Sequence, residues 1–288
     1  MKFLKLFFGL IIFFILFAAV ISPMSGCKKT EIEHDTTNHL VHDTTINNIH
    51  DTTIIVDTVY DLVHGLIGYY NFNGGNLNDS SGYGNNINLN TAIKTTDRFG
   101  RANNAYFFDG SVGYMRVPNS PSLNPSSITI MAIVEFAGFN DGICKVSQIL
   151  MKGFQDQDNG TYGLRVVTGA GDCATVLDTT QERLLGYYGD YATLSNYAFG
   201  TSYFLHTNTW LTLVFTYDGY VNKLYINGDL VGSNTVAAQF HPNVNDLNIG
   251  QTENPSFYYA FTGSIDEIRI YNRALSPELV KLLNKLSR

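Results

Sequence analysis

An Asn-Gly pair between two apolar runs, at residues 224–231, constrains the fold of this chain more than any other feature. Asn227 and Gly228 both tolerate positive φ angles, and the type I′ turn that matches the twist of a β-hairpin requires such angles at its two central positions. A second turn signal, Asp-Gly at 218–219, comes just before this hairpin. The two turns predict a three-stranded antiparallel meander over residues 210–233.

Short alternating or aromatic-rich runs recur through residues 65–288, between clusters of Gly, Asn and Asp. Tyr, Phe and Val favour pleated, half-buried surfaces, and the chain has 18 Tyr and 19 Phe. The pattern predicts an all-β domain built as a sandwich of antiparallel sheets. The expected strands cover residues 66–72, 105–108, 114–117, 127–136, 148–152, 162–167, 184–188, 202–206, 210–217, 223–226, 229–233, 246–249 and 263–271.

One short helix is expected at the C-terminus. Ser276 is placed to cap it, and Pro277 follows at the first helical position, where a missing N–H is harmless. Four leucines then form one apolar stripe, namely Leu279, Leu282, Leu283 and Leu286. We expect this stripe to lie against the sandwich and to cover an edge or an open end.

Residues 1–26 have the pattern of a secretory signal, with two lysines, an apolar run and a small-residue end. The run is shorter than the roughly 20 residues that a membrane-spanning helix needs. Cys27 follows a small residue, which resembles the lipobox of bacterial lipoproteins, although Met24 stands where Leu is usual. The alternative is an uncleaved membrane anchor. We expect a protein of the cell envelope, lipid-anchored through Cys27 at the outer membrane or cell surface.

Removal of the signal takes away Lys2 and Lys5 and no acidic residue, which leaves 16 basic and 25 acidic residues and a formal charge of −9. Nucleic-acid binding depends on many Lys and Arg contacts to phosphates. The charge therefore argues against a nucleic acid as the partner.

Residues 27–64 differ in composition from the rest and form a predicted spacer. The unit His-Asp-Thr-Thr starts at His34, His42 and His50, with a period of eight and a degenerate copy at 56–59. Residues eight apart in a strand lie about 26 Å from each other, so these histidines cannot share one ion unless the segment folds back. The alternative to a solvated spacer is side-by-side association of several chains through isoleucines, namely Ile46, Ile49, Ile54 and Ile55.

Two cysteines remain beyond the anchor, Cys144 and Cys173, each in a segment with Gly and Asp. An oxidising compartment permits a disulfide between them, which would join two loops. The alternative is two separate buried thiols.

Four segments, in order along the chain, carry a family resemblance: 66–85, 99–118, the meander at 210–228, and 261–276. Together they resemble the laminin G-like domains of the concanavalin A-like lectin/glucanase family. The resemblance implies a jelly-roll sandwich of two antiparallel sheets over residues 65–288. It does not fix the ligand, since one fold hosts many functions.

Glycosidases of this family place carboxylates alternately along one strand, and retaining chemistry needs two carboxyl groups about 5–5.5 Å apart. The matching strand patterns, Glu-x-Asp-x-Glu and Glu-x-Asp-x-x-Glu, do not occur in this sequence, and the alternating pair Glu31 and Glu33 lies in the predicted spacer. Asp266 and Glu267 are adjacent, so we expect them to point to opposite faces of a strand. His206 and His241 have no Ser or Cys nucleophile motif beside them. We therefore expect a protein that is not an enzyme, with a glycoside hydrolase as the less favoured alternative.

The resemblance also suggests a structural calcium ion between the last strand and the first. Asp266 matches the acid of the last strand, and Asn73, Asp109 and Asp79 are candidate partners. Calcium takes about 6–8 oxygen ligands, which carboxylates, carbonyls and waters can supply. The alternative is that Asp266 caps a buried turn and that Asp79 and Asp109 form turns.

Sugar binding needs aromatic faces beside amide and carboxylate groups, and two segments offer this mixture. The candidate ligand-binding residues are Tyr187, Tyr188, Tyr191, Asn196 and Tyr258. The alternative role of such aromatics is to fill the core. We predict carbohydrate binding as the function, and protein-binding adhesion through the same loops as the alternative, so the expected partner is a glycan or an extracellular protein.

Overall fold

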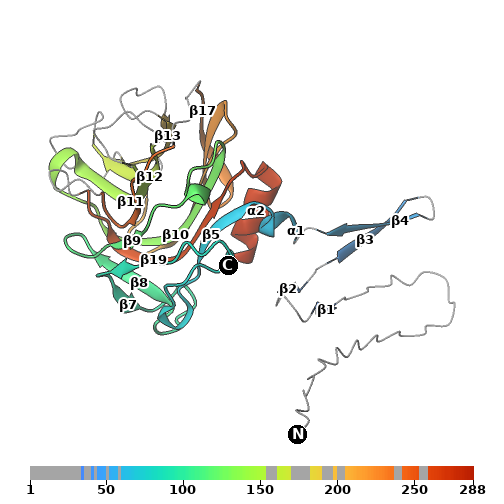
Figure 1. The fold of residues 1–288 in the computed structure, drawn as a ribbon, viewed down its shortest axis with the longest axis horizontal. Coiled ribbons are helices and arrows are strands. Elements are labelled where there is room, and N and C mark those ends of the chain that lie inside the picture. Colours follow the sequence, from blue (N-terminus) through green and yellow to red (C-terminus); the bar gives the residue numbers. More distant parts are fainter. Residues whose placement is uncertain are drawn as a thin grey trace, which may run out of the picture. The chain divides into compact units, whose positions relative to one another are not determined.

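The structure is a computed structural model that describes residues 34–35, 40–41, 44–49, 52–57, 60–153, 161–169, 182–189, 197–199, 205–236, 242–252 and 259–288. The chain divides into two compact units, Met1–Asp57 and Thr58–Arg288. The second unit contains two antiparallel sheets packed face to face (Figure 1). The predicted fold class, an all-β sandwich with a short C-terminal helix, is confirmed.

The eight-stranded sheet contains the predicted meander and the last strand of the chain. Its order is β17-β16-β15-β10-β19-β8-β7, and β5 pairs with β19 beyond the end of β8. The strands are β5 (Leu66–Tyr70), β7 (Ile93–Thr95), β8 (Ala105–Asp109), β10 (Ile128–Gly138), β15 (Trp210–Tyr217), β16 (Val221–Ile226), β17 (Asp229–Thr235) and β19 (Thr262–Tyr271).

The seven-stranded sheet has the order β14-β13-β12-β11-β18-β9-β6. Its strands are β6 (Leu89–Asn90), β9 (Met115–Val117), β11 (Val146–Lys152), β12 (Thr161–Thr168), β13 (Glu182–Gly189), β14 (Tyr197–Phe199) and β18 (Leu247–Ile249). The short strands β6, β7 and β14 were not predicted from the sequence. The strand predicted at 202–206 does not appear at 205–206, and residues 202–204 lie outside the described part of the chain.

The Asn-Gly hairpin forms as predicted. Asn227 and Gly228 have φ angles of 53° and 85°, and they connect β16 directly to β17. The two positive φ angles match a type I′ turn. A register shift between Leu224 and Tyr225 adds a bulge to this ribbon.

The main core lies between the two sheets and is rich in aromatic side chains. Phe72, Phe108 and Phe136 are fully buried there. The hydroxyl groups of two core tyrosines, Tyr162 and Tyr188, donate hydrogen bonds to the carbonyls of Leu123 and Pro125. A buried hydroxyl without a partner would be costly, so these bonds let tyrosine serve as a core residue.

The C-terminal helix α2 (Pro277–Leu286) begins as predicted, because the Ser276 hydroxyl accepts a hydrogen bond from the backbone N–H of Leu279 at 3.3 Å. The helix covers the outer face of the eight-stranded sheet rather than an edge or an open end. Val280 and Leu283 are buried against residues of that face, including Met131 and Ile133. The predicted stripe is wrong at Leu286, which is 59% exposed.

A short helix, α1 (Tyr60–Val63), belongs to the same unit as the sandwich. Its Leu62 is buried in the cluster beneath α2. The sandwich unit therefore starts at Thr58, a few residues before the predicted boundary at 65. Three single turns of 3-10 helix complete the unit, at η1 (Asn73–Gly75), η2 (Pro121–Leu123) and η3 (Ile143–Lys145).

The first unit contains strands within the His-Asp-Thr-Thr repeat. Strand β1 (His34–Asp35) pairs with β2 (Leu40–Val41), and β3 (Thr44–Ile49) pairs with β4 (Thr52–Asp57), both antiparallel. Each pair is a sheet of two strands. Among the described residues, no helix has both the length and the apolar character needed to cross a membrane.

Candidate functional site

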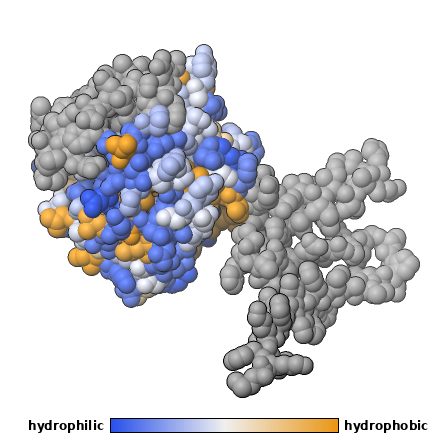
Figure 2. Space-filling view, in the orientation of Figure 1, coloured by the Kyte–Doolittle hydropathy of each residue, from blue (hydrophilic) through white to orange (hydrophobic). Residues whose placement is uncertain are grey.

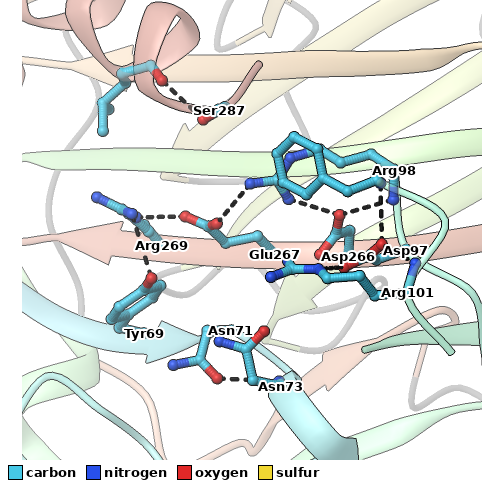
Figure 3. Close-up of polar contacts among 12 residues, drawn as sticks. Tyr69, Asn71, Asn73, Asp97, Arg98, Arg101, Asp266, Glu267, Arg269 and Ser287 are labelled. Carbon is cyan, nitrogen blue, oxygen red and sulfur yellow. Dashed lines mark hydrogen bonds and ion pairs between the residues drawn. The ribbon is translucent and has the colours of Figure 1, made fainter. Parts of the chain in front are cut away.

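A β-bulge in β19 brings Asp266 and Glu267 to one guanidinium group. Ile133 pairs with Glu267 and Val134 with Ile265, so Asp266 is the extra residue of β19. Arg98 donates to Asp266 at 2.6 Å and contacts Glu267 at 3.4 Å (Figure 3). The sequence-based expectation that the two carboxylates point to opposite faces is therefore wrong, because a bulge interrupts the alternation of a strand.

The ion pairs continue along β19 to the first strand of the sandwich. Arg269 donates from Nε to Glu267 at 2.6 Å and from Nη2 to the Tyr69 hydroxyl at 3.3 Å, and its guanidinium lies 4.5 Å from the centre of the Tyr69 ring (Figure 3). Burial opposes the charged form of Arg269, but the nearby groups of Glu267, Tyr271 and Tyr69 hold the Arg269 pKa above its usual value. This chain of contacts joins β19 to β5.

Arg98 is held in place by a tightly bonded loop. Asp97 accepts hydrogen bonds from the backbone N–H groups of Phe99 and Arg101, at 2.9 and 2.8 Å, and from Arg101 Nε at 2.6 Å. Burial alone would raise the Asp97 pKa, but these bonds bring it below its usual value. Asp97 therefore fixes the loop that presents Arg98 to β19.

The contacts of Asp266 show what this cluster can do. Its carboxylate is 3% exposed and accepts from both the backbone N–H and the side chain of Arg98. Burial raises the Asp266 pKa and Arg98 lowers it in part. Since buried charges need partners, the arrangement is suited to fastening the loop at 97–101 to the last strand. Both acids of β19 are already bound to a cation of the chain.

The other residues predicted around calcium do not gather at Asp266. Asp109 is paired with Thr262, four positions from Asp266 on β19, which corresponds to about 13 Å along a strand. Its Oδ1 accepts from the backbone N–H groups of residues 111–113, and these bonds, led by the one from Gly113, lower its pKa. Asp109 therefore forms a turn, as the alternative interpretation held.

Asp79 also forms a turn. It accepts from the backbone N–H groups of Tyr69, Ser81 and Asn85, at 2.9, 2.8 and 3.0 Å, and from the Ser81 hydroxyl. Asn73 is exposed, and its backbone N–H donates to Asn71 at 3.1 Å (Figure 3). Within the described part of the chain, no three His, Cys, Asp or Glu residues lie together as a metal site. The calcium ion stays a prediction.

Two of the four tyrosines predicted to contact sugars, Tyr187 and Tyr188, are buried. Tyr188 is 3% exposed and stacks on Tyr217 in the core, with ring centres 4.3 Å apart. Tyr187 is 1% exposed on the opposite face of β13, and its hydroxyl occupies the space that a side chain at Gly163 would need. Neither ring offers a free face, so the alternative role as packing residues holds for this pair.

The remaining predicted residues lie outside the described part of the chain. These are Cys27, Cys173, Tyr191, Asn196 and Tyr258. Cys144 is described and buried, with a φ angle of 59°. Its pairing with Cys173 stays a prediction, as does the ligand-binding role of the other three.

The outer face of the seven-stranded sheet is the second candidate site, and two of its polar residues, Arg165 and Asn248, are only 4% and 2% exposed. Core residues alternate along β12, β18 and β9, so Arg165, Asn248 and Arg116 lie on the face turned away from the core. The Arg165 guanidinium lies 5.3 Å from the centre of the Tyr187 ring, and Arg116 is 3.6 Å from Asp246. Sequence reasoning missed these residues, although a polar residue between core positions of a strand is the signal that marks this face.

Carboxylates are scarce on this sheet. Among its described strands the one acidic residue is Glu182. Glu182 shares the core-facing side of β13 with Leu184, is 3% exposed, and accepts a hydrogen bond from the Leu205 backbone N–H at 2.6 Å. Burial raises its pKa. The described strands of this sheet therefore offer no pair of acids of the kind that glycoside hydrolysis uses.

Comparison with known proteins identifies the family. The family model described as "Concanavalin A-like lectin/glucanases superfamily" matches residues 108–281. The chain belongs to this superfamily, as the sequence motifs indicated. No curated protein sequence matches it.

Solved structures share the fold at low sequence identity. Domain 4 of AbnA, a GH43 extracellular arabinanase from Geobacillus stearothermophilus solved in complex with arabinotriose, is 22% identical with a TM-score of 0.55, over 76% of this chain and 98% of that one. The binding domain of Paraclostridial Mosquitocidal Protein 1 is 15% identical with a TM-score of 0.57, over 76% and 52%. A Trypanosoma rangeli sialidase is 17% identical with a TM-score of 0.54, over 82% and 34%.

Proposed function

We propose that the sandwich is a carbohydrate-recognition domain without hydrolase activity. The observation that carries this proposal is the single acid on the strands of the seven-stranded sheet, since Glu182 faces the core and has no second carboxylate beside it on those strands. Two-carboxylate hydrolysis is therefore disfavoured, while the family and the arabinotriose-bound neighbour favour binding.

The ligand is proposed to be a polar polymer rather than an apolar one. On the face shown in Figure 2, the described surface is mostly hydrophilic, and its hydrophobic residues occur in small separate groups. Scattered apolar residues are normal on soluble proteins and do not define an interface. A glycan, whose hydroxyl groups need hydrogen-bonding partners, fits such a surface.

The binding residues are proposed to lie in the segments that follow β13 and β18 along the sequence, with Tyr191, Asn196 and Tyr258 as the contacts. The exported chain without its anchor, residues 28–288, should bind a defined polysaccharide on a glycan array. Tyr191→Ala or Tyr258→Ala should then weaken the affinity about tenfold or more, as loss of an aromatic anchor does. Tyr83→Ala is the matched control, since Tyr83 is 55% exposed in the loop after β5.

An array without any glycan signal, together with retained binding of an extracellular protein, would favour the adhesion alternative and contradict the proposal. Binding that resists both tyrosine substitutions would keep the carbohydrate function but remove these residues from the site.

The same proposal includes export and a lipid anchor on Cys27. The support is the sequence pattern of residues 1–27. Cells that express the chain should incorporate labelled palmitate into it and retain it in the membrane fraction. Cys27→Ser should abolish the label and release the protein, whereas Cys144→Ser should keep the label. Membrane retention of the Cys27→Ser protein would indicate an uncleaved anchor instead.

A further inference from the structure

Strands β3 and β4 lie in the predicted spacer, residues 27–64, which we call the stalk. They form a ribbon whose outer edges have no partner among the described residues. β3 pairs with β4 and with no other described strand (Figure 1). Each outer edge of such a ribbon presents backbone N–H and C=O groups that a further strand can bond. A two-stranded hairpin alone is marginally stable in water, and three or more strands are needed for independent stability.

The stalk lacks most of the features that keep edge strands from pairing. Residues 31–57 contain no Gly, Pro, Lys or Arg, and β3 and β4 pair over six residues without a bulge. The edges of the sandwich differ. β7 has three residues and includes Lys94, and β17 pairs through a bulge. Lysine, short length and bulges are the usual protections of an edge.

The register places apolar positions on both faces of the ribbon. Ile46 is opposite Ile55, and at the next position Ile54 is opposite Asn47. Neighbouring pairs belong to opposite faces, because the faces of a strand alternate at every residue.

The repeat itself indicates the partner. Thr-Thr-Ile occurs at 44–46 and again at 52–54, eight residues later. Eight is a multiple of the two-residue period of a strand, so a shift by one repeat keeps every residue on the same face. A second copy of the chain can thus pair in register or one repeat out of register with nearly the same cross-strand pairs. An unrelated protein lacks this match.

We propose that the stalks of several copies of this chain pair edge to edge, so that the repeat is an association module that gathers the recognition domains. Six acidic residues, without any Lys or Arg in residues 31–57, oppose this pairing through repulsion. Salt screens repulsion between exposed charges. Added sodium chloride should therefore strengthen the association, opposite to the effect on an interface held by ion pairs.

The test is sedimentation velocity of residues 28–288 over a concentration series, at low and high sodium chloride. The wild-type chain should form dimers or larger species, with a larger share at high salt. Ile46→Pro with Ile54→Pro should give monomers, since proline cannot bond within a central strand. Lys29→Pro, which precedes every described strand, should behave as the wild type.

Residues 58–288 serve as a second comparison, since that unit has its own core, and they should be monomeric. Monomeric residues 28–288 at every concentration and salt level would overturn the proposal. Association that survives in residues 58–288 or in the double proline variant would also overturn it, because the stalk would then not be the cause.

Discussion

The two sheets of the sandwich differ in what their strands carry and in how they are connected. The eight-stranded sheet has Asp109, Glu135, Asp229, Asp266 and Glu267 against Lys94, Lys223 and Arg269. The seven-stranded sheet has Glu182 against Arg116, Lys152, Arg165 and Arg183. The strands of the first sheet therefore carry net negative charge and those of the second net positive charge.

The connections differ as well. β15, β16 and β17 are joined by residues 218–220 and 227–228, whereas β11, β12 and β13 are joined by residues 153–160 and 169–181. Short turns fix a sheet, and longer connections on a rigid sheet are where binding residues usually lie. Helix α2 and the contacts of Arg98 stabilise the eight-stranded sheet from its outer face, and the proposed recognition would lie on the side of the seven-stranded sheet.

The largest expected effect concerns Tyr188, which the sequence had suggested as a ligand contact. Tyr188→Ala should lower the free energy of unfolding by about 3–5 kcal/mol, as for other large core aromatics, because it removes a ring stacked on Tyr217. Urea denaturation measures this, with Tyr83→Ala as the control. A change within about 0.5 kcal/mol, typical of surface sites, would show that Tyr188 is a surface residue and not part of the core.

A slightly smaller effect is expected beneath α2. Leu283→Ala should cost about 2–4 kcal/mol because it leaves a cavity between the helix and the eight-stranded sheet. Leu286→Ala is the matched control on the same helix, since Leu286 is 59% exposed. Equal effects of the two substitutions in thermal denaturation would show that α2 does not cover the sheet in this register.

A smaller loss of stability is expected when the contacts of Arg98 with Asp266 and Glu267 are removed. Arg98→Ala leaves Asp266 buried without a guanidinium and Glu267 with Arg269 alone, and we expect a loss of about 2–3 kcal/mol, below that of a fully buried pair, because Arg98 keeps some exposure. Adding Asp266→Asn to this variant should restore part of the loss. No recovery in the double variant would mean that the charge of Asp266 is not the cause.

The smallest expected effect tests the calcium prediction. Since Arg98 already binds the Asp266 carboxylate, the predicted ion should add little stability, and EDTA should lower the melting temperature only slightly. Calcium should reverse this fall and Asp266→Asn should remove it, whereas an unchanged melting temperature in EDTA would contradict the prediction.

Local sequence signals predicted the parts of this fold that depend on local geometry. Asn227 and Gly228 specified their hairpin, and Ser276 and Pro277 specified the start of α2, because turn and cap preferences act within a few residues. The joining of Asp266 and Glu267 at Arg98 could not be predicted this way. It depends on a bulge between β10 and β19, strands far apart in the sequence.

The tyrosines of β13 show a second limit. Alternation predicts that Tyr187 and Tyr188 face opposite sides of the strand, and they do, yet both are buried. Whether the side turned away from the core is covered depends on contacts distant in sequence. Glu182 is the one acidic residue on the described strands of its sheet. This argument against hydrolysis could be made only once the pairing of those strands was known.

Recognition without hydrolysis can be tested by one titration. Residues 28–288 are mixed with the oligosaccharide that scores highest on the array, and calorimetry is followed by measurement of new reducing ends in the same sample. We predict saturable binding and no release of reducing ends, with Glu182→Gln unchanged in affinity. Release of reducing ends that Glu182→Gln abolishes would contradict it and make the protein a hydrolase.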